Sequence, residues 1–199
     1  YHIYLAAHYL ASGAAFVEHA TGRLLSDPDR WREVFIRACS LAPIETALMA
    51  VDALYPDTGA TSTGFADSDF RRWRVMLVGA EALRTIGIDL VRTRAERRRI
   101  LDRVVHWLMR LLAESGLPST CRISAATVLG ELGDPRPGVM EPRPAMVEMP
   151  AGPVLIAPVR VGLQGASAER QIYQLPYSLF IARYPVTQYQ YREFLRANP

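Results

Sequence analysis

The sequence contains no lysine, only two cysteines and no apolar run long enough to cross a membrane. All 23 basic residues are arginines, so a Gly-x-x-x-x-Gly-Lys-Ser/Thr phosphate loop, which needs a lysine, is excluded from these residues. A membrane-spanning helix needs about 20 predominantly apolar residues in a row, and every apolar stretch here is interrupted by charge sooner. Two cysteines are too few for a disulfide framework or a cysteine-rich zinc site.

The two cysteines, Cys39 and Cys121, lie far apart in the chain and in apolar surroundings. We expect both to be buried free thiols, which is typical of a reducing compartment. The sequence therefore favours a cytoplasmic location.

Other catalytic patterns are also missing. There is no His-Glu-x-x-His zinc helix and no Gly-x-Ser-x-Gly nucleophile elbow. The remaining titratable candidates are the histidines His2, His8 and His19 and the carboxylate pairs Asp27/Asp29 and Asp67/Asp69. The histidines are spaced too widely to share one helix face, and the carboxylates stand at expected helix starts, where negative charge favours the helix dipole. We expect no catalytic, cofactor-binding or metal-binding residue in this chain, which leaves open whether the whole protein is an enzyme.

What the sequence does have is ordinary globular composition, with 199 residues, 50% hydrophobic and 22% charged. That length allows one large domain or two modest ones. The chain begins without Met inside a helical pattern and stops at Asn198-Pro199. We therefore expect it to be an interior piece of a longer polypeptide.

The net charge is +3, and the basic residues cluster in one stretch. The cluster is Arg92, Arg94, Arg97, Arg98, Arg99, Arg103 and Arg110. A basic helix face could meet phosphate or an acidic partner, or it could be a solvated outer face. We favour the solvated face, because aromatic residues do not alternate with these arginines as a single-strand stacking platform requires. We expect neither nucleic acid nor a membrane as a partner.

Residues 1–133 have the apolar spacing of successive helices. Asp27 is expected to cap one helix, with Pro28 at its first helical position and a buried face of Trp31, Val34, Phe35 and Ala38. Thr93 and Glu96 are expected to form a capping box for another. We expect six or so helices, with a loop over 55–66. The helix at 2–10 is apolar nearly all round and is expected to be buried, and the helix at 93–112 is expected to stop at Gly116. The predicted helices include 2–10, 27–38, 44–54, 70–86, 93–112 and 119–132. They predict an antiparallel helical stack.

The composition changes at Gly133. Residues 134–145 contain four prolines and are expected to be an extended linker. Beyond them the period falls towards two, and short strands are expected at 146–149, 154–156, 171–175 and 179–183. Thr187 is expected to cap a final helix, with Tyr191 and Phe194 or Leu195 facing inward. The predicted organisation is a helical domain (1–133), a proline-rich linker (134–145) and a β-rich domain (146–199).

The β-rich part resembles the opening of the formylglycine-generating enzyme (sulfatase-modifying factor) family. The resemblance lies in Met149-Pro150-Ala151-Gly152-Pro153 and in the stretch from Ile181 to Phe194, where Val186, Thr187, Tyr191 and Phe194 match a Val-Thr-Asn-x-x-Tyr-x-x-Phe helix start. Gln188 departs from the usual Asn, and Ile156-Ala157 from the common Met-Gly. The resemblance covers about residues 145–199 and implies the incomplete start of a C-type-lectin-like fold. The family's copper-binding cysteines belong to a later part of that domain.

A second resemblance concerns the helical part. Tyr1-His2-Ile3-Tyr4-Leu5-Ala6-Ala7 looks like the Phe-Gln-Glu-Tyr-Leu-Ala-Ala motif that follows the ATPase in NACHT-type signalling NTPases of the STAND class. The stretch from Arg122 to Arg136 looks like a HEAT-type helix ending in a Leu-Gly-Asp-Pro turn. Helices of this kind followed by a sulfatase-modifying-factor-like domain resemble a bacterial signalling layout.

Three functions follow as expectations. The first is a non-catalytic scaffold and sensor segment of a bacterial signalling NTPase, joining the ATPase to a C-terminal domain that recognises a protein or small ligand. The second is a fragment of a formylglycine-generating oxidase whose catalytic cysteines lie beyond residue 199. The third is a structural helical adaptor without a switch. No cofactor is expected in these residues, and oligomers are possible through the parent NTPase.

Overall fold

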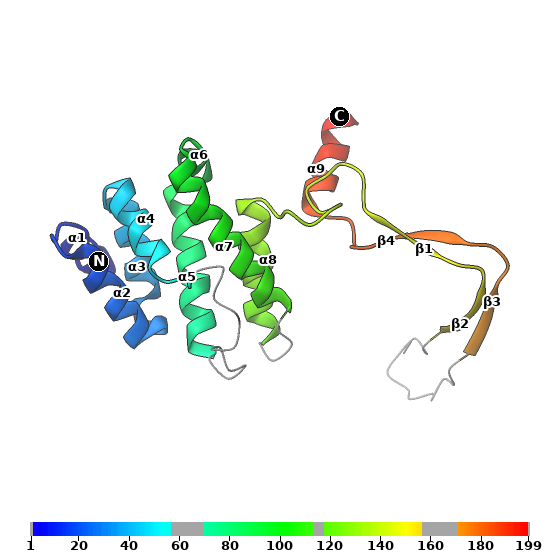
Figure 1. Ribbon diagram of the computed structural model, residues 1–199, viewed down its shortest axis with the longest axis horizontal. Coiled ribbons are helices and arrows are strands. Elements are labelled where there is room, and N and C mark those ends of the chain that lie inside the picture. The colour runs from blue at the N-terminus through cyan, green and yellow to red at the C-terminus, as the bar shows by residue number, and fades with distance from the viewer. Residues whose placement is uncertain (1, 57–69, 114–117, 157–170, 199) are drawn as a thin grey trace. The chain divides into compact units, whose positions relative to one another are not determined.

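The computed structural model describes residues 2–56, 70–113, 118–156 and 171–198, and these residues are mainly helical (Figure 1). The chain forms two compact units, Tyr1–Asp134 and Pro135–Pro199. They are called unit 1 and unit 2 below. In the part of the chain just defined, no helix is both long and apolar enough to span a bilayer.

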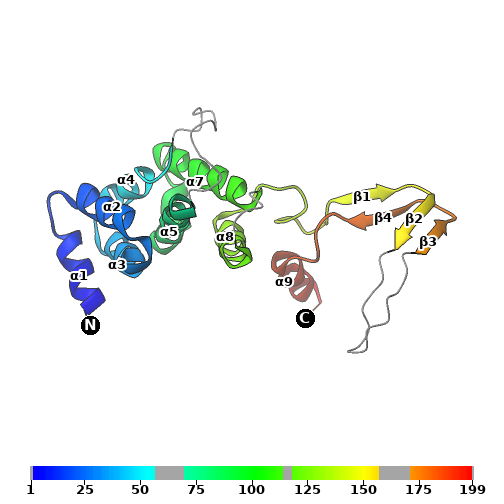
Figure 2. The same cartoon turned by 90° about the horizontal axis from the view of Figure 1, so that it is seen from below.

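Unit 1 is a two-layered array of helices. Its elements are α1 (His2–Ala11), α2 (Phe16–Ser26), α3 (Pro28–Leu41), α4 (Ile44–Asp52), α5 (Phe70–Ile86), α6 (Ile88–Arg92), α7 (Ala95–Ala113) and α8 (Ser119–Leu132). Figure 2 shows α1, α3, α5 and α8 side by side in one layer, with α2, α4 and α7 in the other. Helix α3 packs between α1 and α5, and α5 packs between α3 and α8.

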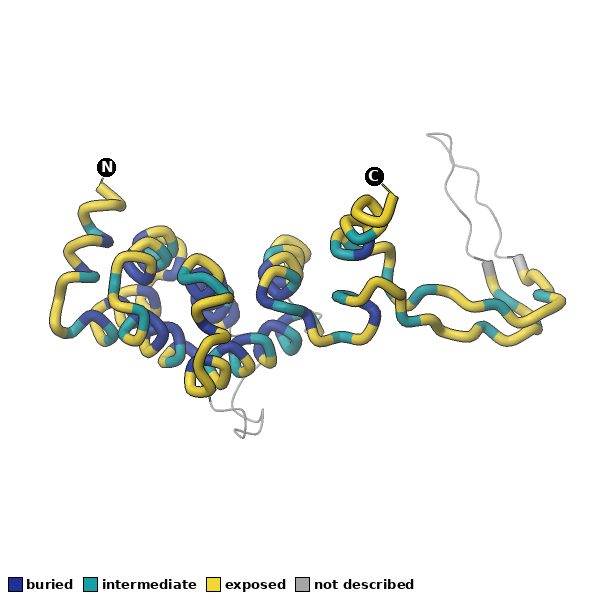
Figure 3. The backbone as a smooth tube through the Cα atoms, turned by 90° about the horizontal axis from the view of Figure 1, so that it is seen from above, coloured by how far each residue is buried: buried dark blue, intermediate teal, exposed yellow. Residues whose placement is uncertain are grey.

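The hydrophobic core of unit 1 lies between the two layers, where the buried residues of Figure 3 gather. Helix α5 contributes most to it, because small and branched side chains such as Val75, Ala80 and Leu83 are buried on several of its sides. The rings of Trp73 on α5 and Trp107 on α7 are 6.1 Å apart between centroids, so aromatic packing joins the two layers.

The predicted start of α3 is confirmed. The Asp27 carboxylate accepts a hydrogen bond from the backbone N–H of Arg30 at 3.1 Å, and Pro28 occupies the first turn. Capping satisfies an N–H that has no partner inside the helix. On the predicted apolar face, Val34, Phe35 and Ala38 are buried, and Trp31 is partly buried against the core. The bounds expected for α5 and α8 also agree with the structure.

The expectation of a fully buried first helix is wrong. Only Ala7 and Leu10 of α1 are buried, and the large side chains of Tyr4, Leu5 and Tyr9 are about half exposed or more. The reason is position, since α1 stands at one end of the array and packs only on α2 and α3. Helix α2, which follows it, was not predicted.

The capping box expected at Thr93 is also wrong. Thr93 instead follows the last residue of α6, and its hydroxyl donates to the Leu90 carbonyl at 2.7 Å. Helix α7 begins two residues later, at Ala95. The spacing predicts an apolar stripe on that helix made of Ile100, Leu101, Val104, Val105, Leu108, Leu111 and Leu112. Leu101, Val104, Leu108 and Leu111 are buried, and the other three are partly buried against the core. The expected stop at Gly116 and most of the expected loop over 55–66 lie outside the described residues.

Unit 2 is built from four strands and a helix among its described residues. They are β1 (Met146–Met149), β2 (Gly152–Ile156), β3 (Gln171–Leu175), β4 (Leu179–Ala182) and α9 (Gln188–Ala197). Strand β1 pairs with β4 and β2 with β3, both antiparallel, with Val147 opposite Ile181 and Val154 opposite Tyr173. The strands therefore form two ladders along one folded-back ribbon, and their bounds agree closely with those predicted.

The proline-rich segment before β1 differs in conformation from the extended chain that was expected. The backbone N–H of Val139 donates to the Arg136 carbonyl at 3.2 Å, which closes a turn, and Gly138 within it is buried with φ +76°. The Gln190 amide on α9 donates to the Gly138 carbonyl at 2.9 Å. Prolines fix φ values that also suit turns, and here the turn is held by α9.

Helix α9 begins as predicted, but its apolar face does not point inward. Thr187 and Gln190 form a reciprocal capping box. Tyr191, Phe194 and Leu195 are 56%, 59% and 48% exposed, and the rings of Tyr191 and Phe194 stack on each other. Among the described residues of unit 2, no hydrophobic side chain reaches full burial, so α9 has no core to face.

Candidate functional site

Unit 1 has a cleft of about 250 Å³ on the α1–α3–α5–α8 layer. It is lined by Pro28, Asp29 and Arg32 of α3, by Arg74, Leu77, Val78 and Glu81 of α5, and by Thr120, Cys121 and Ser124 of α8. Three helices from distant parts of the sequence thus place charged, hydroxyl and thiol groups around a small apolar floor.

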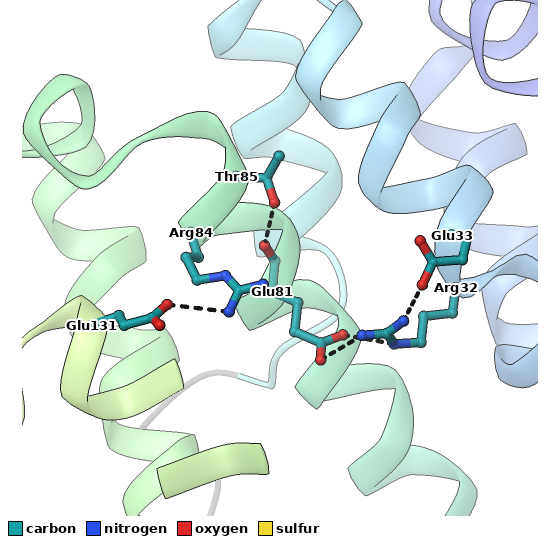
Figure 4. A network of polar contacts seen from close by, with 6 residues as sticks. All are labelled: Arg32, Glu33, Glu81, Arg84, Thr85 and Glu131. Atoms are coloured by element: carbon teal, nitrogen blue, oxygen red, sulfur yellow. Dashed lines mark hydrogen bonds and ion pairs between the residues drawn. The ribbon is translucent and has the colours of Figure 1, made fainter. Parts of the chain in front are cut away.

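An ion pair between a buried glutamate and a partly exposed arginine lies along the cleft (Figure 4). The Glu81 side chain is only 8% exposed. The Arg32 guanidinium donates two hydrogen bonds to its carboxylate, from Nε to Oε2 at 2.9 Å and from Nη2 to Oε1 at 2.8 Å. This bidentate geometry is the strong form of an arginine–carboxylate contact. The hydrogen bond to Glu81 and the charges of Glu81 and Glu33 raise the pKa of Arg32 against the opposing effect of desolvation, so its guanidinium stays charged.

Further ion pairs cross the same layer. Arg84 of α5 contacts Glu131 of α8 at 3.1 Å (Figure 4), and Arg74 of α5 bonds Asp29 of α3, with Nη1 2.7 Å from Oδ2. Each pair joins two neighbouring helices. Because the carboxylates around the cleft already have arginine partners, the arrangement suits holding helices in register better than activating a nucleophile.

The clustered arginines of α6 and α7 are used in the same way. Arg97 donates to Glu45 of α4 from Nη2 at 2.6 Å, and Arg103 donates to Asp52 of α4 at 2.9 Å. The Arg97 hydrogen bond, helped by the charges of Arg97 and Arg94, lowers the pKa of Glu45 against a smaller opposing effect of desolvation. Both arginines tie α7 to α4.

Other members of the cluster bind backbone or an aromatic ring. Arg92 donates to the Leu132 carbonyl at 3.2 Å, Arg98 donates to the Arg92 carbonyl at 2.9 Å, and Arg110 lies 4.9 Å from the Trp107 ring centroid. Much of the positive charge in this stretch is therefore engaged within unit 1.

The histidines and carboxylates considered from the sequence are not brought together. His2, His8 and His19 are exposed on α1 and α2. Asp27 caps α3 and Asp29 pairs with Arg74, while Asp67 and Asp69 lie outside the described residues. Within the described ranges, no three side chains among His, Cys, Asp and Glu are grouped to hold a metal ion.

The two cysteines differ in environment. Cys39 is buried, as expected, and burial raises its pKa to about 12. Cys121 is only partly buried and lines the cleft, which corrects the expectation that both thiols are buried. Cys39 is thus an unreactive core residue.

Sequence reasoning missed Glu81, the most buried carboxylate of the cleft. A signal was present, since Glu81 follows the apolar residues Leu77 and Val78 at the helical spacings of four and three. A carboxylate on such a face needs a partner. That the partner is Arg32, on another helix, could not be found from spacing.

Unit 2 presents a different kind of surface, made of exposed apolar side chains. On the ribbon, Val147 and Ile181 face each other across β1 and β4, each 48% exposed, while Leu155 and Ile172 face each other across β2 and β3 at 57% and 70%. Apolar residues thus stand in cross-strand pairs without cover.

Comparison with known proteins gives no match to a family model, a curated protein or a solved structure.

Proposed function

We propose that this chain is a non-catalytic scaffold and sensor segment of a multidomain bacterial signalling NTPase. In this proposal, unit 1 is a HEAT-like stack that holds or transmits a conformational state from an ATPase. Unit 2 is the start of a C-type-lectin-like domain that recognises a protein or small ligand. The protein acts in the cytoplasm, and any oligomer forms through the NTPase.

The observation that carries this proposal is the use of arginine in unit 1. Ion pairs join α3 to α5, α5 to α8 and α4 to α7, through Arg32–Glu81, Arg84–Glu131 and Arg97–Glu45. Pairs of this kind hold neighbouring helices in register, which suits a scaffold between two active domains. The open apolar pairs of unit 2 supply the complementary part, a surface suited to recognition.

The second candidate is a fragment of a formylglycine-generating oxidase, with unit 1 as an appended domain. The order of elements in unit 2 favours it, because two short strands around Pro150-Ala151-Gly152-Pro153, two returning strands and a helix capped by Thr187 follow the pattern of the resemblance. An oxidase of this class would use copper bound by cysteines, which would have to lie beyond residue 199.

The sequence of the parent gene distinguishes the two functions. The scaffold proposal expects a Gly-x-x-x-x-Gly-Lys-Ser/Thr loop encoded upstream of Tyr1 and ATP hydrolysis by the full-length protein. The oxidase proposal expects paired cysteines encoded downstream of Pro199 and copper-dependent oxidation of a peptide cysteine. A gene with the cysteines and without the phosphate loop would overturn the scaffold proposal.

A further inference from the structure

The outer face of α1 carries an uncovered apolar stripe. Residues 2–11 include no arginine, aspartate or glutamate. Ala7 and Leu10 are buried against the rest of unit 1, and the opposite face carries Tyr4, Leu5, His8 and Tyr9, which we call the outer stripe. Tyr9 is 79% exposed, and the Tyr4 and His8 rings stack with centroids 6.4 Å apart. Residues spaced by one and four positions form one face of a helix and are typical of helix–helix contacts.

The opposite end of the layer is different. Helix α8 exposes Ala126 and Thr127, and Ile123 is its one exposed large hydrophobic residue among those described. Stacked helices need a polar outer face where the stack ends in solvent. The α8 end meets this condition much better than the α1 end. The exposed face of α1 therefore resembles an inner face of the layer, against which a further helix would pack.

The uncovered stripe is one helix wide. Helix α2, which stands beside α1 in the other layer, turns Glu18, His19 and Ser26 to solvent, with Leu25 as its exposed large hydrophobic residue. A complete second pair of helices would bury the charged Glu18. The surface therefore fits a single helix laid along α1, as α3 is laid along its inner face.

The size of the stripe indicates how that helix is attached. A helix of ten residues is only about 15 Å long, so the stripe is a small surface. A stable interface between separate proteins buries about 800 Å² per partner. A second copy held by this stripe alone would dissociate, whereas a covalently attached helix has an effective concentration in the millimolar range.

We propose that the outer stripe of α1 is covered by a helix formed by the polypeptide that precedes Tyr1 in the full-length protein, extending the layer of α1, α3, α5 and α8. Residues encoded just before Tyr1 would be tethered beside the stripe. The covering helix needs a mainly apolar face, which leaves room for the polar atoms of His8 and the tyrosines. This inference does not depend on the proposed ATPase, because it requires a helix and no nucleotide site.

Hydrogen exchange of the α1 amides tests the inference. The 199-residue chain is compared with a protein extended upstream by about 40 residues of its own sequence, enough for a helix and its connections. The α1 amides should exchange about tenfold or more slowly in the extended protein, because local opening must then break the new contact. Tyr9→Glu in the extended protein should restore the faster rate, and the control Leu90→Glu, at an exposed leucine of α6, should not.

Three results would overturn the inference: equal α1 exchange in the two proteins, equal effects of Tyr9→Glu and Leu90→Glu, or a gene that encodes nothing upstream of Tyr1. Sedimentation of the 199-residue chain as a dimer that Tyr9→Glu dissociates would also overturn it, in favour of a second copy. A phosphate loop upstream with α1 still exchanging fast would leave the scaffold proposal standing. Slow α1 exchange in a protein without a phosphate loop would support this inference and overturn the scaffold proposal.

Discussion

At the scale of single residues, arginine does in unit 1 what lysine could not do as well. A guanidinium is planar and presents several N–H groups in a fixed fork, so one side chain can hold both oxygens of a carboxylate. Arg32 does this to Glu81 across α3 and α5. The lysine-free composition, which by itself suggests only a GC-rich gene, is thus suited to joining helices.

Glu81→Gln is expected to destabilise unit 1. The amide keeps the size of the side chain but removes the charge that Arg32 faces, leaving a buried polar group with a weaker partner. We expect a loss of about 1–3 kcal/mol in the free energy of unfolding, measured by urea denaturation. Glu131→Gln is the matched control, because its exposed pair with Arg84 is worth at most about 1 kcal/mol. Equal losses in the two variants would contradict a special role for the Arg32–Glu81 pair.

The pair of Arg97 and Glu45 predicts an acid dependence of stability. Because the Arg97 hydrogen bond lowers the pKa of Glu45 in the folded protein, the unfolded chain binds the proton first as the pH falls. The contribution of this carboxylate is therefore complete above the ordinary glutamate pKa of about 4.3 and is lost as the pH falls through the lowered folded value.

We expect Glu45→Gln to lose stability less steeply than the parent chain below about pH 4.5, in thermal unfolding followed from pH 7 to pH 3. Arg97→Gln should flatten the acid limb in the same way, and the double variant should add nothing further. An unchanged acid limb in Glu45→Gln would contradict the assignment.

At the scale of elements, the turn before β1 and the start of α9 support each other. Thr187 accepts from the Gln190 backbone N–H at 3.2 Å and donates to the Val139 carbonyl at 2.9 Å, and the Gln190 side chain bonds both the Thr187 N–H and the Gly138 carbonyl. One helix cap therefore also holds the proline-rich turn. These hydrogen bonds form the main side-chain network among the described residues of unit 2.

Gly138→Ala is expected to break the hydrogen bonds between this turn and α9. A Cβ at position 138 would clash with the backbone nitrogen of Ala145, and φ +76° is strained for alanine. Loss of the turn should fray α9 and be seen as faster exchange of the Gln190 amide. Gly130→Ala in α8 is the control, because its Cβ would meet nothing within 4 Å and alanine favours a helix by about 1 kcal/mol. Intact α9 protection in Gly138→Ala would contradict this account.

The sequence predicted where helices and strands lie better than it predicted which of their faces are buried. Asp27 and Thr187 mark helix starts because a cap is a local interaction, and the strands follow from alternation and proline punctuation. Thr93 failed as a cap because its hydroxyl bonds back to Leu90. The apolar patterns of α1 and α9 were predicted to be buried, yet periodicity states only which residues share a face. What covers that face, and which arginine meets Glu81, depends on packing between distant segments.

At the scale of the whole molecule, the two units differ in how they are stabilised. Unit 1 has a continuous core from Ala7 to Leu132, whereas the described hydrophobic side chains of unit 2 are all at least partly exposed. Burial of apolar surface contributes about 25 cal/mol per Å², so residues 135–156 and 171–198 of unit 2 gain little of this main source of folding free energy. We therefore propose that unit 1 is a stable helical body, whereas the apolar faces described in unit 2 stay open to a partner.

Hydrogen exchange along the entire 199-residue chain tests this claim most directly. We predict that amides of α3, α5 and α7 exchange only by global unfolding, while amides of β1 to β4 exchange within a few tens of times of the unfolded rate. Addition of a partner that covers the ribbon would then slow the strands and leave α3, α5 and α7 unchanged. Strand amides as protected as those of α5 in the isolated chain would contradict the claim, because they would require a buried core in unit 2.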